Sequence, residues 1–230
     1  MTFKIIAESL QNLTNSDRHF LQKIKQSAAP FNFTVEIEYY NFSGVTYEEA
    51  RKNMHIEAEK AINEKTEDGG IAVGIVKFVP LLASYKTFRY VVNRQLTTAY
   101  PVGMTLQASA KVILPHYNGI ASPEDIDKIQ KMVNDITKHE QVHVCIAVAG
   151  FNQVKQAALG INGKGKSKLV AGNDLNANIQ KTFDAINFET AAKQQAYDTE
   201  THHGTKAAEQ EKYNKTITAE CDSYYEVLYK

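Results

Sequence analysis

Two hydrophobic periodicities divide the chain near residue 121. Upstream of that point, residues 33–42 alternate apolar and polar side chains, as a half-buried strand does. Two segments have helical spacing with start signals instead, one over residues 16–28 and one that begins at Thr46. Three further stretches are rich in β-branched and aromatic residues and predict about three strands that pair antiparallel with each other. They are residues 69–79, 86–100 and 103–115.

Downstream of residue 121 the spacing becomes helical. Ser122 and Pro123 suit the N-cap and the first position of a helix that ends at Gly160. Apolar side chains recur at helical intervals within it, at Ile126, Ile129, Val133 and Ile136. A polar loop that contains glycines is expected at 160–173, and helices are expected over 174–198 and 205–230.

These patterns predict one α+β domain over residues 1–230. Residues 1–121 are expected to contain an antiparallel sheet, and residues 122–230 a long helix and further helices. The chain has two cysteines, Cys145 and Cys221, and the sequence leaves open whether they pair.

The strongest chemical signal lies inside the long helix, where His139, Glu140 and His143 interrupt an apolar run. Histidines four residues apart lie on one helix face, with Cβ atoms about 5–6 Å apart. Two imidazoles at that spacing can hold one Zn²⁺ at about 2.0–2.1 Å each. Glu140 then stands beside the metal, where it can take a proton from a water molecule. This H-E-x-x-H arrangement predicts His139 and His143 as metal ligands and Glu140 as the catalytic base.

A catalytic zinc needs a third protein ligand, and no histidine follows the motif closely on the same helix. His202 and His203 stand at the junction between two predicted helices, from which a side chain can fold back to the motif. Glu200 and Glu209 are the nearest carboxylate alternatives. The residues by themselves leave this choice open.

Four segments, taken in order, resemble the bacterial family called domain of unknown function 922, whose members are interpreted as zinc-dependent proteases. They are residues 39–54, 111–117, 139–143 and 197–204. The specific part of the likeness is HEQVH followed by Tyr-Asp-x-x-Thr-x-His-Gly, which places His203, before Gly204, at the histidine position of the pattern. The resemblance implies a zincin-like metalloprotease fold and a Zn²⁺ held by His139, His143 and His203.

Two more residues of the last segment have candidate roles. Asp198 can accept the outer N–H of a ligand histidine, or it can cap the following turn. Tyr197 can donate a hydrogen bond to an oxyanion that develops during catalysis, and a buried structural tyrosine is the alternative. The predicted function is zinc-dependent hydrolysis of a peptide or protein substrate. The alternative is a non-catalytic, zinc-containing binding or structural module.

Composition narrows the partners of the protein. Lys+Arg and Asp+Glu both number 26, and this zero net charge argues against a nucleic-acid partner. No apolar run is long enough to span a bilayer. The first residues lack the features of an export signal, so a cytoplasmic location is expected, or an extracytoplasmic one if the chain is a trimmed form. The oligomeric state is not indicated.

One segment matches a motif only formally. Residues 160–167, GINGKGKS, fit the spacing of a phosphate-binding loop. That loop requires an apolar strand before it, and the residues before 160 have a helical pattern instead. A mobile surface loop is therefore expected there, without a bound nucleotide.

Overall fold

The computed structural model describes residues 6–7, 32–65, 70–85, 87–93, 96–102, 104–206, 208–213 and 215. Its strands are β1 (Ile6–Ala7), β2 (Asn32–Phe42), β3 (Ile75–Ser84), β4 (Thr87–Asn93), β5 (Leu96–Val102), β6 (Thr105–Tyr117) and β7 (Gly163–Gly165). Its helices are α2 (Tyr47–Ala61), α3 (Pro123–Gly160) and α4 (Lys168–Thr201). The helix predicted at 16–28 lies outside the described residues, and of the one predicted at 205–230, positions 208–213 and 215 are helical.

The main sheet has four strands in the order β1-β2-β6-β3. β3 and β6 pair antiparallel, as predicted, but β2 and β6 pair parallel from Asn32↔Gln107 to Phe42↔Tyr117. The sheet is therefore mixed, and the prediction of an antiparallel sheet was wrong for this pair. Alternation of apolar and polar residues reports that a strand has one buried face, but it carries no information on the direction of the neighbouring strand.

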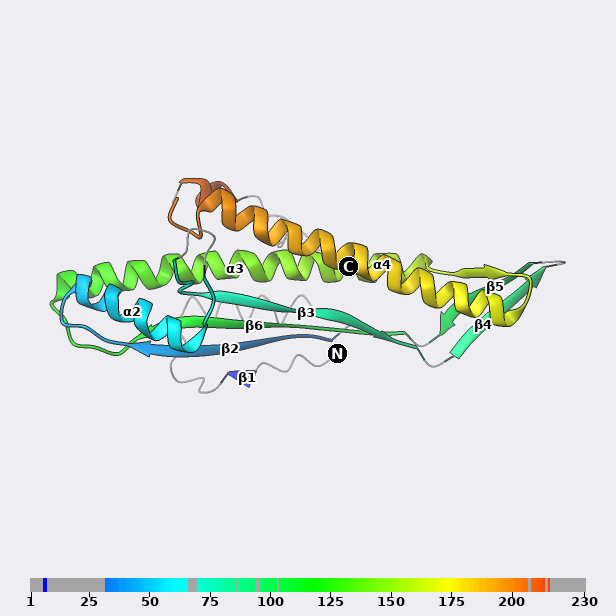
Figure 1. The fold of residues 1–230 in the computed structure, drawn as a ribbon, viewed down its shortest axis with the longest axis horizontal. Helices are drawn as coiled ribbons and strands as arrows, with labels where there is room; N and C mark the ends of the chain where they lie inside the picture. The colour runs from blue at the N-terminus through cyan, green and yellow to red at the C-terminus, as the bar shows by residue number, and fades with distance from the viewer. Residues whose placement is uncertain are drawn as a thin grey trace.

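A second sheet, with the order β4-β5-β7, lies at one end of the elongated molecule (Figure 1). The segment 86–100 was predicted as one strand, but it contributes to two, which pair antiparallel as far as Asn93↔Leu96. β7 pairs with β5 inside the expected polar loop, and a Cβ at Gly163 would lie only 2.1 Å from the backbone nitrogen of Leu175. Glycine at this position therefore lets the strand lie against α4. The helix α3, and not the apolar strand that a phosphate-binding loop requires, precedes residues 160–167.

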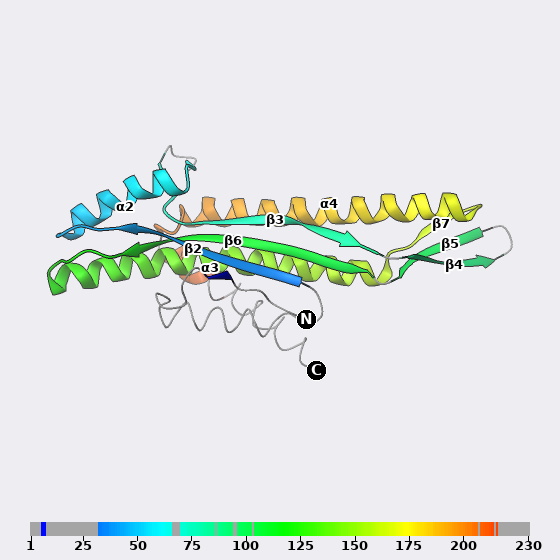
Figure 2. The same cartoon turned by 90° about the horizontal axis from the view of Figure 1, so that it is seen from below.

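The helices α3 and α4 run antiparallel, side by side along the main sheet (Figures 1 and 2). Ser122 caps α3 as predicted, because its side chain accepts a hydrogen bond from the backbone N–H of Asp125. Ser167 caps α4 in the same way, which explains why the helix begins at Lys168, inside the expected loop. No helix among the described residues is long and apolar enough to cross a lipid bilayer.

Packing between β6 and α3 positions the middle of the long helix. Every second residue of β6 from Leu106 to Leu114 is buried, and the row includes the small side chains Ala108 and Ala110. Small side chains allow α3 to lie close to the sheet. β3 forms the edge of this sheet among the described strands, and α4 lies beside it. The central turns of α3 therefore face a space between the edge strand and α4.

Candidate metal centre

The HEQVH residues lie in the middle of α3, as predicted, and His139, Glu140 and His143 are almost fully buried. His139 and Glu140 are each 4% exposed, and His143 is 7% exposed. Buried polar side chains are costly unless they are paired or hold an ion. Their partners come from α4, which passes the motif on the side of the edge strand.

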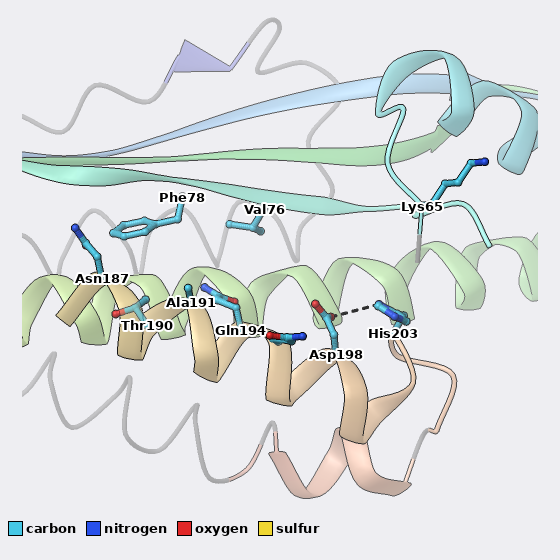
Figure 3. Close-up of a pocket in the computed structure, with 10 residues that line it drawn as sticks. Lys65, Val76, Phe78, Asn187, Thr190, Ala191, Gln194, Asp198 and His203 are labelled. Carbon is cyan, nitrogen blue, oxygen red and sulfur yellow. Dashed lines mark ion pairs between the residues drawn. The ribbon is translucent and has the colours of Figure 1, made fainter. Parts of the chain in front are cut away.

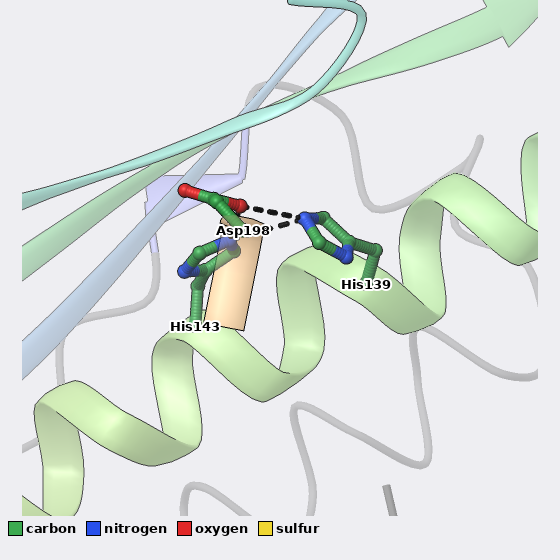
Figure 4. Close-up of side chains that lie close together, drawn as sticks. All are labelled: His139, His143 and Asp198. Atoms are coloured by element: carbon green, nitrogen blue, oxygen red, sulfur yellow. Dashed lines mark hydrogen bonds and ion pairs between the residues drawn. The ribbon is translucent and has the colours of Figure 1, made fainter. Parts of the chain in front are cut away.

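Asp198 of α4 joins the two imidazoles in a compact group (Figure 4). Its Oδ1 lies 3.0 Å from Nε2 of His139 and 2.9 Å from Nε2 of His143, and the two Nε2 atoms are 3.2 Å apart. These three potential ligand atoms thus lie close enough to one another to bind a single ion. The sequence offered Asp198 as a partner of a ligand histidine or as the cap of the following turn, whereas in the structure its Oδ1 contacts Nε2 of both imidazoles.

His203 lies next to this group. Its Nδ1 is 3.6 Å from Oδ1 of Asp198, and its side chain is 32% exposed (Figure 3). The turn that carries it has positive φ angles, 46° at His202, 52° at His203 and 82° at Gly204. Left-handed backbone is uncommon for residues other than glycine and persists where the surroundings enforce it. Here the backbone N–H of His203 donates to the carbonyl of Asp198 at 3.0 Å, which folds the chain back toward the motif.

The other candidates for a third ligand are placed differently. His202 is the C-cap of α4 and is exposed, although it contributes to the rim of the cavity described below. Glu200 and Glu209 are also exposed. None of these three side chains belongs to the group of ligand atoms formed by the described residues.

Each imidazole of the group has further contacts that hold its ring. Gln194 of α4 contacts Nδ1 of His143 through its Oε1, and its Nε2 donates to the backbone carbonyl of His143 at 2.9 Å. Tyr197 is fully buried and stacks on His139, with ring centroids 4.6 Å apart and an interplanar angle of 19°. Its ring also meets His143 edge-on. This placement favours the structural interpretation of Tyr197 over a role as oxyanion donor.

Burial and charge set the ionisation of the group. Burial lowers the pKa of His139, and the hydrogen bond to Asp198 opposes this only in part. Burial also lowers the pKa of His143, but its hydrogen bond to Asp198 and the charge of Glu140 outweigh burial and raise the pKa to about 8. Burial opposes the ionisation of Asp198, yet the two imidazoles hold its pKa well below its usual range. Asp198 is therefore a carboxylate at neutral pH.

Glu140 is the base predicted from the motif, and it lies against Gly74 in the segment that leads into β3. A Cβ at Gly74 would lie 2.8 Å from Oε1 of Glu140 and 2.8 Å from Cγ2 of Ile136, so a side chain there would displace the carboxylate. The adjacent residue is anchored, because the hydroxyl of Tyr40 donates to the carbonyl of Val73 at 2.6 Å. Burial raises the pKa of Glu140 to about 7, and the charge of His143 opposes this.

Glu140→Gln is expected to stabilise the metal-free protein more at pH 8 than at pH 5. The pKa of this carboxyl rises from 4.5 to about 7 on folding, so the folded state binds more protons between these values. The contribution of this carboxyl to the stability of the wild type therefore falls as the pH rises from about 4.5 to about 7, by on the order of 3 kcal/mol, and then levels off. Thermal unfolding in the presence of a chelator measures this.

The control is Glu124→Gln, the same change on the same helix at a side chain that is 81% exposed. Because the change removes an ion pair with Lys128, its unfolding temperature should differ from that of the wild type by the same small amount at both pH values. A Glu140→Gln effect of equal size at pH 5 and pH 8 would show that the carboxyl has its ordinary pKa.

The group opens into a cavity of about 480 Å³. It is lined by the group itself and Glu140, by His203, and by the segment that leads into β3, from Gly70 to Val76. A second hollow of about 580 Å³ continues from Asp198 between β3 and α4 (Figure 3). This second hollow, the trough, is lined by Lys65, Val76, Phe78, Asn187, Thr190, Ala191, Gln194, Gln195, Asp198 and His203. The centre therefore lies within a continuous depression on the surface.

Residues 37–204 match the model of the family described as "Bacterial protein of unknown function (DUF922)". The matched range covers well over half of the chain. The chain belongs to this family. The likeness first noted on the HEQVH segment and on residues 197–204 is thereby confirmed, and the range includes every residue of the group and Glu140. No curated protein and no solved structure matches the chain.

Gly204 ends the range that matches the family, and its conformation explains why glycine stands there. Besides the positive φ angle, a Cβ at this position would lie 2.8 Å from Oε1 of Gln210 and 3.3 Å from Nδ1 of His139. A larger residue would therefore have both a strained backbone and contacts that are too close. The turn after α4 can approach the back of His139 only with glycine at this position.

Sequence reasoning missed two glutamines and left one pairing open. Gln194 lies four residues before Asp198, so helical spacing puts both on the same face of α4, and this signal could have identified it. Gln210 packs behind His139, beyond the range that matches the family, and no pattern pointed to it. Cys145 of α3 is disulfide-bonded, and Cys221 lies outside the described residues.

Proposed function

We propose that the protein is a zinc-dependent hydrolase, most specifically a metallopeptidase with a zincin-like active site. The observation that carries the proposal is the triangle formed by Nε2 of His139, Nε2 of His143 and Oδ1 of Asp198, with sides of 2.9–3.2 Å. Ligand atoms held at about 2.0–2.1 Å by a tetrahedral ion stand about 3.4 Å from one another. The triangle thus needs little change to hold Zn²⁺.

The buried carboxylate beside the triangle favours hydrolysis over other metal chemistry. Two histidines and a carboxylate also suit iron(II), so the ligand set alone does not select the metal. Glu140, however, is buried next to the group without being part of it, and its Oε2 has no hydrogen-bond partner among the described residues. A carboxylate in that position serves as a base for a water molecule, as in the H-E-x-x-H peptidases.

In this proposal the third ligand is Asp198, and His203 has another role. His203 was predicted as the ligand, but its Nδ1 lies 3.6 Å from the carboxylate oxygen that contacts both imidazoles. Because its side chain is partly exposed and lines the cavity, we assign it the donation of a hydrogen bond to the oxygen of the scissile carbonyl. Gln194 holds His143 so that Nε2 faces the centre.

The proposed reaction divides the work between these groups. Zinc, when bound, supplies a Lewis acid that acidifies a water molecule and polarises the scissile carbonyl. Glu140 accepts the proton from the attacking water and later passes it to the leaving amine. Burial raises the pKa of this carboxyl to about 7 in the metal-free protein, and the charge of a bound metal would lower it, so Glu140 would be ionised and able to accept the proton.

The shape of the surface supports an extended peptide as substrate. β3 is an edge strand among the described residues, and an edge strand can pair with an added chain. The α4 residues of the trough recur at helical spacing from Asn187 to Asp198, which corresponds to about 16 Å along the helix. An extended chain advances about 3.3 Å per residue, so the trough has room for about five residues beside the metal centre.

Filling the trough is expected to slow peptide cleavage without removing the metal. Ala191→Phe places a ring between α4 and the side chains of Val76 and Phe78, so kcat/KM should fall at least about 10-fold, mostly through KM, because substrate binding is lost uniformly. Ala192→Phe is the matched control, because Ala192 is next to Ala191 in the chain but is exposed and does not line the trough. Equal rates in the two variants would show that substrate does not lie there.

The alternative function is a non-catalytic zinc module, which would require a closed shell of four protein ligands. The described residues supply three ligand atoms in the group and a cavity on the open side, which favours catalysis. Elemental analysis of the purified protein for zinc and iron, together with casein hydrolysis before and after chelation, tests the proposal. Metal-free protein that hydrolyses casein at the same rate would refute it.

A further inference from the structure

The two imidazoles of the centre differ in the hydrogen-bond partner of the outer ring nitrogen, Nδ1. Nδ1 of His143 has a partner in Gln194, whereas Nδ1 of His139 is buried and has no hydrogen-bond partner among the described residues. A histidine that binds a metal through Nε2 has a proton on Nδ1, and this N–H almost always donates to a nearby oxygen. An oxygen that accepts a hydrogen bond from Nδ1–H is therefore expected close to the ring of His139.

Oε1 of Gln210 is a second buried atom without a partner among the described residues, and it lies near the ring of His139, beside Gly204. A single point, the Cβ position of Gly204, is 2.8 Å from this oxygen and 3.3 Å from Nδ1 of His139. One atom is a hydrogen-bond donor and the other an acceptor. Two complementary groups buried side by side are expected to pair, directly or through one water molecule.

The orientation of the Gln210 amide is fixed by its other end. Its Nε2 donates to the backbone carbonyl of Asp135, one turn before His139 on α3, at 3.1 Å. Because a carbonyl can only accept, the nitrogen must be the atom on that side, and Oε1 must point toward His139. Gln194 makes both kinds of contact at His143: its Nε2 donates to the carbonyl of His143 and its Oε1 contacts the imidazole. Of these two, Gln210 makes the contact to a carbonyl of α3, and its Oε1 has no partner among the described residues.

We propose that Gln210 is a positioning residue for the metal centre: its Oε1 accepts a hydrogen bond from Nδ1–H of His139 and so directs Nε2 of that ring to the metal. Gln194 and Gln210 then hold the two ligand histidines in the same way. Gln194 does so from α4, before the turn at Gly204, and Gln210 from the helical segment after it. The inference rests on the proposed metal centre. It also assigns a function to the helical segment after that turn, from which Tyr213 packs on Tyr197 with ring centroids 5.2 Å apart.

Zinc affinity, measured by competition with a chelator, tests the proposal without any substrate. Gln210→Leu should raise the dissociation constant about 10–100-fold, the usual effect of removing such a partner. Gln194→Leu should do the same at His143. Gln210→Glu keeps an acceptor oxygen for Nδ1–H of His139 but loses the N–H that donates to the carbonyl of Asp135, so its zinc affinity should fall less than that of Gln210→Leu. Glu209→Ala, an exposed neighbour, is the control that should change nothing.

A spectroscopic measurement separates positioning from a general structural effect. In zinc-loaded protein with ¹⁵N-labelled histidine, the Nδ1–H protons of His139 and His143 should both give signals protected from exchange with water. Gln210→Leu should remove or shift only the His139 signal, and Gln194→Leu only that of His143. If Gln210→Leu does not fold, the His139 signal in the wild type and in Gln210→Glu still tests whether Gln210 positions His139.

The possible failures can be told apart. Wild-type protein that binds no metal would refute the metal centre itself. Tight zinc binding that is weakened by Gln194→Leu and unchanged by Gln210→Leu would overturn only the inference about Gln210. A zinc-loaded wild type without a protected His139 Nδ1–H would overturn it as well.

Discussion

Glu140→Gln is expected to keep its metal and to lose hydrolysis by about 10²–10⁴-fold, the usual contribution of general acid–base catalysis. The amide has the size of the carboxylate but cannot accept a proton. Because Glu140 is not part of the group of ligand atoms, zinc content should not change. The experiment measures casein hydrolysis and zinc on the same samples of wild type and variant.

Glu124→Gln is the matched control, because it makes the same chemical change near the start of the same helix, where the side chain is exposed. Its activity and zinc content should equal those of the wild type. If casein is not a substrate, a mixture of short peptides with varied sequence takes its place. Full-rate cleavage by Glu140→Gln would refute the role of this carboxylate as the base, even with zinc bound at the centre.

Removal of the ligand side chains should abolish metal binding. We expect about one zinc per chain in the wild type, and none in the double variant His139→Ala, His143→Ala, because two-thirds of the ligand set is then missing. Hydrolysis should disappear with the metal. The measurements are elemental analysis and circular dichroism, since the spectrum shows whether the helices persist. Zinc retained in full by the double variant would end the proposal.

The same measurement identifies the third ligand. If Asp198 binds the metal, Asp198→Ala should weaken zinc binding by more than the 10–100-fold that is typical of a residue behind a ligand. His203→Ala should then lower hydrolysis more than zinc affinity. The reverse result, with His203→Ala losing zinc and Asp198→Ala retaining it, would restore the ligand set implied by the sequence resemblance.

Much of the centre could be predicted because its core is local in sequence. His139 and His143 share a helix face whenever residues 123–160 are helical, and the caps and apolar spacing of that helix are encoded in its own residues. Asp198 could be identified as a candidate, since it lies in the segment that resembles the family, but its role could not. Whether a side chain is a ligand or a partner of a ligand depends on which ring nitrogen it contacts, and the sequence does not specify this.

Patterns of alternation had a clear limit in the sheets. Alternation identified β2, and β-branched and aromatic composition identified β3 and β6, but such patterns could not give the parallel pairing of β2 with β6. They also could not show that a segment of three residues, Gly163–Gly165, would pair with β5. A buried face is a property of one strand, whereas direction and register are properties of two strands that are far apart in the chain.

By itself, the sequence determined the helix, the spacing of its two histidines and the position of Glu140 between them, because these follow from helical geometry within five residues. Only the tertiary structure decided that Asp198, which is 55 residues beyond His143, completes the group, and that Gln210 stands behind His139. These placements depend on how α4 packs along α3 and on the left-handed turn at Gly204. Packing of that kind is a sum of many weak contacts between distant residues, and no short pattern in the sequence contains it.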